Sequence, residues 1–186
     1  MREEIQSAVD ALKKGEIIIY PTDTIWGIGC DATSEKAVRR IYEIKKREES
    51  KSLVTLVSDW EMLNKYVPSV PLHVSKFLDR VNKPTTVVYD NPVGIASNAI
   101  ASDDSVAIRI PKNEFCIELI RAFGGPIIST SANYSGSPSP GCFSDISKEL
   151  LAEADYIVNL SREETQNSAS QIVRFDKDGQ VIYIRK

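Results

Sequence analysis

The chain has 186 residues, of which 42% are hydrophobic and 26% charged, and its formal net charge is −3. This composition is close to that of an average globular protein, which argues against a disordered or fibrous chain and predicts one domain over residues 1–186. Because the net charge is negative, any polyanionic ligand must be met by a local cluster of cations.

Helix and strand patterns alternate along the first half of the chain. Apolar residues at helical spacing predict a helix over 2–14, which stops at Gly15, and a second helix over 34–47 with Ser34 as its N-cap. Shorter helices are expected from Asp59 and over 71–82. The β-branched and apolar runs of this half predict strands at 16–20, 53–57 and 85–89.

The second half continues the alternation and ends in a hairpin. Asn113 is expected to cap a helix that Gly124 closes, and a further helix is expected near 144–153. The predicted strands are 105–110, 126–129, 155–160, 171–175 and 181–184. Because a terminal hairpin must be antiparallel, we predict an α/β domain with a twisted mixed sheet and flanking helices, not a purely parallel sheet.

The cysteines, the histidine and the chain start bear on location and metal binding. Cys30, Cys116 and Cys142 are odd in number and far apart, which suits reduced thiols in the cytoplasm. A single histidine, His73, excludes a multi-histidine metal site. No apolar run approaches the ~20 residues of a membrane-spanning helix, and acids stand where a secretory signal has cations, so no membrane partner is expected.

Polar segments interrupt this scaffold at strand ends, where α/β proteins place their sites. In residues 21–29 (PTDTIWGIG), glycines allow close approach to a ligand and hydroxyls can donate to an anion, although a capped turn explains the segment equally well. A cluster of cations lies at the C-terminal end of a predicted helix, made of Lys45, Lys46 and Arg47 with Lys51. Cations at this end are also stabilised by the helix macrodipole alone. Since Lys45 and Arg47 are two residues apart, they converge on one ligand only if the helix ends there.

Two further segments complete the set. Residues 129–136 (STSANYSG) offer small hydroxyl groups after a buried strand, which suit a carboxylate or phosphate but also ordinary Ser/Thr turns. Arg109 stands alone in the apolar strand VAIRIP, so it needs an acid or a ligand as partner, and either would do. The sequence contains no GxxxxGK[ST] and no GxGxxG, so any ATP pocket would be an unusual one.

In their order and spacing, PTDTIWGIG, KKR, AIRIP and STSANYSG resemble the YrdC-like family, whose typical members are threonylcarbamoyl-AMP synthases. The likeness extends from Leu12 to Arg185 and implies the YrdC-like α/β fold. It also implies a nucleotidyltransferase reaction. L-Threonine captures bicarbonate or CO2 as a carbamate, which attacks the α-phosphorus of ATP and yields threonylcarbamoyl-AMP and pyrophosphate.

The resemblance further implies partners and cofactors. Mg²⁺ is expected with ATP, held mainly by phosphate oxygens and water instead of a protein cage. A transferase complex downstream would move the threonylcarbamoyl group to tRNA. The reactants bring a triphosphate, a carboxylate and a carbamate together, so cations and hydroxyl or amide donors should dominate the walls of the pocket.

Carried over motif by motif, the family's roles fall on residues of this chain. Lys45 and Arg47 match its K-x-R pair and would face the phosphates and the carbamate, with Asp23 and Trp26 shaping the threonine end. The residues implied to bind L-threonine are Thr24, Arg109, Ser131 and Ser170. Those implied to bind ATP are Arg47, Lys51, Ser105, Asn133 and Arg185.

The chain also departs from the family pattern. Glu48 and Ser52 stand where proline is usual, Leu56 replaces a common histidine, and Ser105 replaces a usual threonine. Glu48 adds negative charge beside an anion site. Two other functions stay open at this point: a non-catalytic module that binds double-stranded RNA or tRNA, and a nucleotide binder without catalysis.

Overall fold

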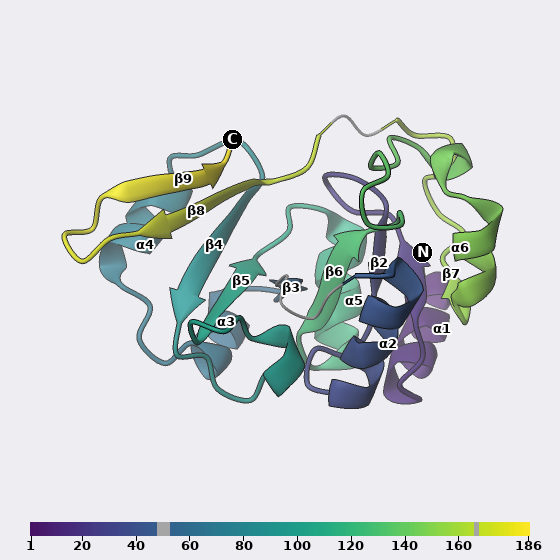
Figure 1. The fold of residues 1–186 in the computed structure, drawn as a ribbon, viewed down its shortest axis with the longest axis horizontal. Helices are drawn as coiled ribbons and strands as arrows, with labels where there is room; N and C mark the ends of the chain where they lie inside the picture. The colour runs from purple at the N-terminus through teal and green to yellow at the C-terminus, as the bar shows by residue number, and fades with distance from the viewer. Residues whose placement is uncertain (48–52, 166–167) are drawn as a thin grey trace.

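A computed structural model of the chain describes residues 1–47, 53–165 and 168–186. In these ranges, helices flank a sheet of nine strands in the order β7-β1-β2-β6-β3-β5-β4-β8-β9 (Figure 1). The pairs β1–β7, β3–β5 and β4–β8 are parallel, and the other neighbours are antiparallel. The predicted α/β fold with a mixed sheet is therefore confirmed, including the antiparallel terminal hairpin.

The strands follow the apolar runs of the sequence, with one addition. Their bounds are β1 Ile18–Tyr20, β2 Gly27–Gly29, β3 Val54–Leu56, β4 Thr85–Asp90, β5 Ser105–Arg109, β6 Ile127–Ser131, β7 Tyr156–Ile157, β8 Gln171–Phe175 and β9 Val181–Arg185. The sequence did not predict β2, which lies inside PTDTIWGIG. A Cβ atom on Gly29 would lie 2.0 Å from the Ile128 carbonyl oxygen, so the approach of β2 to β6 requires glycine at this position.

The helices begin and end close to where caps were expected. Their bounds are α1 Arg2–Lys13, α2 Glu35–Lys45, α3 Trp60–Tyr66, α4 Leu72–Leu78, α5 Glu114–Phe123 and α6 Lys148–Glu153, with short 3-10 turns at Ser97–Ala99 and Phe143–Asp145. Ser34 and Asn113 accept hydrogen bonds from the main-chain N–H of Ala37 and Cys116, which confirms both N-caps. Helix α2 ends at Lys45 because Lys46 adopts a left-handed conformation, with φ of 50°.

The helices cover the two halves of the sheet differently. In the half built from β1, β2 and β6, α2 packs on one face, while α1 and α5 pack on the other (Figure 1). In the other half, α3 and α4 bury Val106, Ile108 and Val173. Side chains alternate along a strand, so Arg109 and Ile172 point to the opposite face of this half. The candidate site forms on that face.

The cysteines are unpaired, and the described helices are short. Cys30 and Cys116 are buried, Cys142 is partly buried, and none of the three forms a disulfide. Among the helices in the described ranges, none is both long enough and apolar enough to cross a membrane.

Candidate functional site

Strand ends that are far apart in the sequence meet around a cavity of about 180 Å³. Strands β2 and β8 begin at this cavity, β5 and β9 end at it, and the last residues of β6 border it. The cavity is lined by Thr22, Thr24, Ile25, Gly27, Arg47, Leu53, Val54, Arg109, Ser129, Thr130, Ser131, Ser139, Ala169, Ser170, Ile172 and Arg185. Among these lining residues are three arginines, seven hydroxyl side chains and no carboxylate, a composition that favours an anionic ligand.

Arg109 is held at one end of this cavity by an acid. Its Nη1 donates to Asp23 Oδ1, and the two side chains are only 4% and 12% exposed. Asp23 Oδ2 also accepts the main-chain N–H of Lys112 at 3.0 Å. Arg109 Nε is buried and has no hydrogen-bond partner among the described residues. The sequence allowed either an acid or a ligand as the partner of Arg109. The structure provides the acid, Asp23, and leaves the Nε donor of Arg109 without an acceptor among the described residues.

The hydroxyl groups of PTDT form a short chain beside this guanidinium. Thr22 Oγ1 lies 2.9 Å from Thr24 Oγ1, accepts the Thr24 main-chain N–H and lies 2.8 Å from the Ile25 carbonyl oxygen, to which it donates. Arg109 Nη2 approaches Thr24 Oγ1 at 3.4 Å. Both threonines are almost fully buried in the protein. The segment is thus a built wall of the cavity as well as a capped turn, so the two interpretations of its sequence are compatible.

The closing hairpin brings a second arginine to the cavity. Arg185 Nε and Nη2 donate to the Ser170 carbonyl oxygen at 3.0 and 2.7 Å, and Ser170 Oγ lies 2.8 Å from Thr86 Oγ1. Burial, and secondarily the charge of Arg109, lower the pKa of Arg185. The two guanidinium groups therefore repel each other across the cavity, and an anion between them would relieve that repulsion.

The end of α2 separates Lys45 from Arg47. Arg47 lies beyond the last helical turn and lines the cavity, whereas Lys45 points beneath the loop after β6. Lys45 Nζ lies 2.5 Å from the Ser131 carbonyl oxygen, 2.6 Å from the Asn133 carbonyl oxygen and 3.4 Å from Asn133 Oδ1. The helix ends where convergence of the two cations required it, but only Arg47 borders the cavity.

Ser131 and Asn133 are joined to each other at the edge of the site. Ser131 Oγ donates to Asn133 Oδ1 at 2.5 Å, and Asn133 Nδ2 donates to the carbonyl oxygens of Ser137 and Pro138 at 2.5 and 3.1 Å. Ser131 lines the cavity, while the amide of Asn133 faces its own loop. The hydrogen bonds from Asn133 to Ser137 and Pro138 hold the chain just before Ser139, which lines the cavity.

Some predicted site residues lie elsewhere. Ser105 begins β5, where its hydroxyl donates to Asp103 Oδ1 at 2.5 Å. It lies four residue steps along the strand from Arg109, or about 13 Å away. Trp26 is fully buried in the core against Phe143 and does not line the cavity. Lys51, like Glu48 and Ser52, lies outside the described residues.

Sequence reasoning overlooked several lining residues. Thr22, Ser129, Thr130 and Ser139 were not singled out, although the first three belong to segments that were. Alternating hydroxyl residues at the end of a buried strand could have identified Ser129 and Ser131 together, since they point to the same face. Nothing local marks Ser139, which reaches the cavity through the hydrogen bonds of Asn133.

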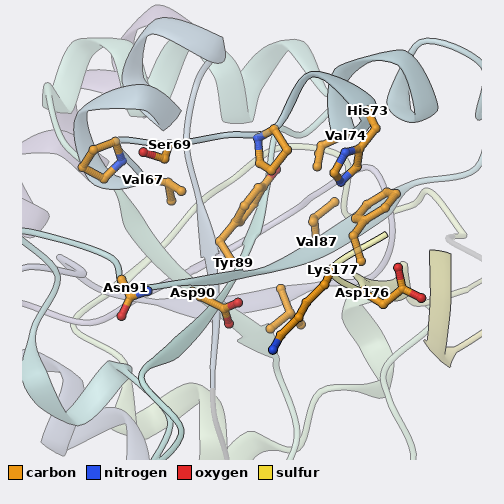
Figure 2. Close-up of a pocket in the computed structure, with 14 residues that line it drawn as sticks. Val67, Ser69, His73, Val74, Val87, Tyr89, Asp90, Asn91, Asp176 and Lys177 are labelled. Carbon is orange, nitrogen blue, oxygen red and sulfur yellow. The ribbon is translucent and has the colours of Figure 1, made fainter. Parts of the chain in front are cut away.

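A larger cavity, of about 540 Å³, lies at the far end of β4 and β8 (Figure 2). Figure 2 shows the side chains of Asp90, Asp176, Lys177 and His73 around an apolar floor that includes Val87. Two carboxylates make this cavity unsuited to a triphosphate. His73 stacks on Phe175 with ring centroids 5.0 Å apart, in this cavity and not in the arginine-lined one. Chemistry, not volume, therefore selects the smaller cavity as the candidate site.

The residues that line the cavity include no carboxylate, cysteine or histidine, the side chains that usually hold a metal ion in a protein. Within the described ranges, no group of three or more His, Cys, Asp or Glu side chains converges as metal ligands do. The donors at the cavity are hydroxyls and guanidinium groups. Such a set fits a metal that arrives with oxygen ligands of its own, as Mg²⁺ does on a nucleotide.

Comparisons with known proteins agree with the architecture. The family model Sua5_yciO_yrdC, described as telomere recombination, matches residues 10–186. A protein of Escherichia coli strain K12 named threonylcarbamoyl-AMP synthase is 34% identical over 140 residues, which are 74% of each chain. A Methanocaldococcus jannaschii protein with a provisional form of the same name is 35% identical over 189 residues, covering 99% of this chain and 87% of its own.

Solved structures show the same fold. P. abyssi Sua5 in complex with L-threonine matches with a TM-score of 0.86 and 25% identity, over 97% of this chain and 53% of that one. This chain therefore spans about half the length of that Sua5 protein. Escherichia coli YciO matches with a TM-score of 0.83 and 20% identity, over 100% of this chain and 90% of that one, which shows the fold alone.

Proposed function

Because the chain belongs to the Sua5/YciO/YrdC family, we propose that it is an L-threonylcarbamoyladenylate synthase, a nucleotidyltransferase that joins L-threonine, bicarbonate and ATP. The observation that carries the proposal is a single cavity lined by Arg47, Arg109 and Arg185 together with seven hydroxyl groups. Relatives at 34–35% identity bear the synthase name, and a Sua5 protein of the same fold was solved with L-threonine. A cavity of this kind also suits small substrates better than the backbone of an RNA duplex.

The threonine end of the cavity is assigned to Arg109. With Nη1 occupied by Asp23, the opposite edge of the guanidinium presents Nε and the outer N–H of Nη2. These two donors form a fork that matches the two oxygens of a carboxylate. Thr24 and Ser131 lie on the same cavity and would contact the amino acid, and Ser170 would close the other side.

The chemistry needs positioning and charge more than a nucleophile from the protein. The threonine amine attacks CO2 and loses a proton, or attacks bicarbonate with loss of water, and either route gives a carbamate. An oxygen of the carbamate then attacks the α-phosphorus of ATP, and the bond from that phosphorus to pyrophosphate breaks. Negative charge develops on the phosphoryl oxygens, where Arg47 and Arg185 would stabilise it. Holding the carbamate beside the phosphorus supplies much of the remaining acceleration.

ATP must extend beyond the arginine-lined cavity. At about 180 Å³ it is smaller than the ~300 Å³ at which small-molecule sites begin. Ser105 lies on the same face of β5 as Arg109, about 13 Å away, and is the proposed contact of the nucleoside. Mg²⁺ would enter on the phosphates of ATP, and Asn133 and Lys51 complete the proposed nucleotide contacts. The product would pass to a complex that modifies tRNA.

Pyrophosphate release tests the proposal. We expect release from ATP only when L-threonine, bicarbonate and Mg²⁺ are all present, and release that continues without threonine would overturn the synthase assignment. Arg109→Lys keeps the charge but loses the fork, so it should raise the KM for threonine at least ten-fold and that for ATP much less. Arg174→Lys is the matched control, because Arg174 pairs with Asp90 and Asp103 away from the cavity. Equal effects of Arg109→Lys on both substrates would contradict the placement of the carboxylate.

A further inference from the structure

Among the described lysines of the candidate set, Lys45 is the one that is buried beneath the site. It is the last residue of α2 and is 1% exposed. Its main-chain oxygen accepts the N–H of Ser135 at 3.0 Å, so the end of α2 contacts the loop after β6 through backbone as well as side chain. A helix C-terminus also favours a nearby cation, which helps to explain why a lysine is tolerated in this interior position.

The three donors of the ammonium group are matched by three acceptors. The carbonyl oxygens of Ser131 and Asn133 lie at 2.5 and 2.6 Å from Nζ, and Asn133 Oδ1 lies at 3.4 Å. An ammonium group has three N–H bonds and no acceptor, so in this arrangement none remains for a phosphate. Conversely, both carbonyl groups would lose a donor if the amine turned toward the cavity, although the Ser131 carbonyl would keep the Asn133 main-chain N–H at 2.8 Å.

The contacts of Lys45 continue to the wall of the cavity. Asn133 Oδ1 accepts the Ser131 hydroxyl, and Asn133 Nδ2 donates to the carbonyls of Ser137 and Pro138. Ser131 and Ser139, at the two ends of this loop, both line the cavity. The buried side chain of Lys45 therefore contacts the start of the stretch from Ser131 to Pro138 directly, and its end through Asn133.

We propose that Lys45 is a positioning residue, which holds the loop from Ser131 to Pro138 against the cavity and makes no contact with a phosphate. Its effect on catalysis rests on the proposed synthase function, whereas its hold on the loop does not. In this arrangement Lys45 acts through Ser131 and Asn133, and Arg47 is the cation of the K-x-R pair that meets the substrate.

Labelling of the wild-type protein tests the placement without any variant. Competitive acetylation read by mass spectrometry compares Lys45 with Lys46, which is exposed and lies 5.0 Å over the Tyr134 ring. We expect Lys45 to react at least 100-fold more slowly than Lys46 in the ligand-free protein, and ATP to leave its rate unchanged. A Lys45 that reacts like Lys46 and becomes protected by ATP would overturn the proposal.

Variants then test the hold on the loop. Lys45→Met removes the three donors, and amide hydrogen exchange of residues 132–137 should accelerate at least ten-fold in the ligand-free protein, while Val87 and Val173 stay protected. Lys36→Met, the matched control, removes an exposed lysine from the first turn of the same helix and should change neither region. Lys45→Arg restores cationic donors and should slow the exchange again relative to Lys45→Met. Unchanged exchange in Lys45→Met refutes the proposal.

Kinetics separate positioning from direct contact. If pyrophosphate release is observed, Lys45→Met should raise the KM for threonine as well as that for ATP, because Ser131 moves with the loop. A loss of kcat with unchanged exchange and unchanged KM for threonine would instead assign Lys45 to the phosphates. If the wild-type protein shows no threonine-dependent release, the proposed function fails, and the labelling and exchange results still decide the role of Lys45 in the loop.

Discussion

Removal of the Asp23 carboxylate tests how the site holds its buried arginine. In Asp23→Ala, Arg109 Nη1 and the main-chain N–H of Lys112 both lose their acceptor. Arg109 is 4% exposed, so its charge cannot turn to solvent without disturbing β5. Breaking a buried ion pair by deleting one partner costs about 3–5 kcal/mol, because the other charge stays buried and unpaired.

Thermal and urea unfolding measure the effect. For a chain of this length, each kcal/mol shifts Tm by about 2–4 °C, so a loss of ~4 kcal/mol should lower Tm by roughly 8–16 °C. Asp90→Ala is the control, because it breaks an ion pair with Arg174 in which the two side chains are 59% and 35% exposed. Such an exposed pair contributes about 1 kcal/mol or less.

The double variant Asp23→Ala/Arg109→Met completes the cycle. It removes the buried charge together with its partner, so its stability should recover most of what Asp23→Ala loses. A loss below ~1 kcal/mol in Asp23→Ala, or a double variant no more stable than the single one, would refute the argument that Asp23 compensates Arg109. The same reasoning would then fail for the free edge assigned to the carboxylate of threonine.

Two other predictions follow from single contacts. Gly29→Ala places a Cβ atom 2.0 Å from the Ile128 carbonyl oxygen, so it should destabilise the fold by more than ~2 kcal/mol in urea unfolding, and a wild-type-like midpoint would contradict the approach of β2 to β6. Burial, and secondarily the charge of Arg47, lower the pKa of Lys45 to about 7. Between about pH 7 and 10.5 the unfolded chain therefore binds more protons than the folded one. The free energy of unfolding should then rise with pH by up to ~1.4 kcal/mol per pH unit. Urea unfolding at pH 7, 8 and 9 should show this excess slope in the wild type and not in Lys45→Met.

The helices were predictable because their signals are local. Ser34 and Asn113 carry the capping oxygen themselves, and the glycine at 124 adopts the left-handed conformation that ends α5. Helix α2 was predicted two residues too long because its terminator is Lys46, a residue type that rarely takes a positive φ. The sequence of that turn contains no glycine to announce the end.

Strand β2 was not predictable from its own residues. Gly27 and Gly29 lack the side chains that mark a strand, and their presence is explained by contacts with β6, whose Ser129 Oγ would lie 3.2 Å from a Cβ on Gly27. The information that makes Gly27–Gly29 a strand therefore resides in a partner about 100 residues away. A local pattern shows glycines near a strand end, which equally describes a loop.

The site was predictable as a set of segments more than as a set of contacts. Strand ends identified the segments of Thr24, Arg109 and Ser131, and the family resemblance added Ser170 and Arg185. The structure brings all five to one cavity. The direction of a long side chain could not be predicted from the sequence pattern, because it depends on where hydrogen-bond acceptors lie in space. Two carbonyls of the β6 loop draw Lys45 inward, and no acceptor pattern in the sequence reveals them.

The polar residues around the cavity are largely committed to one another. Asp23 orients Arg109, Lys45 and Asn133 orient Ser131, and Thr86 lies within hydrogen-bond distance of Ser170. A site whose donors are already fixed needs little rearrangement when charge develops on a bound substrate, and this preorganisation is worth more than additional flexible cations. Motif residues of this chain therefore divide into those that border the cavity and those that hold the bordering ones, and only the measurements that separate substrate affinity from loop order can tell the two groups apart.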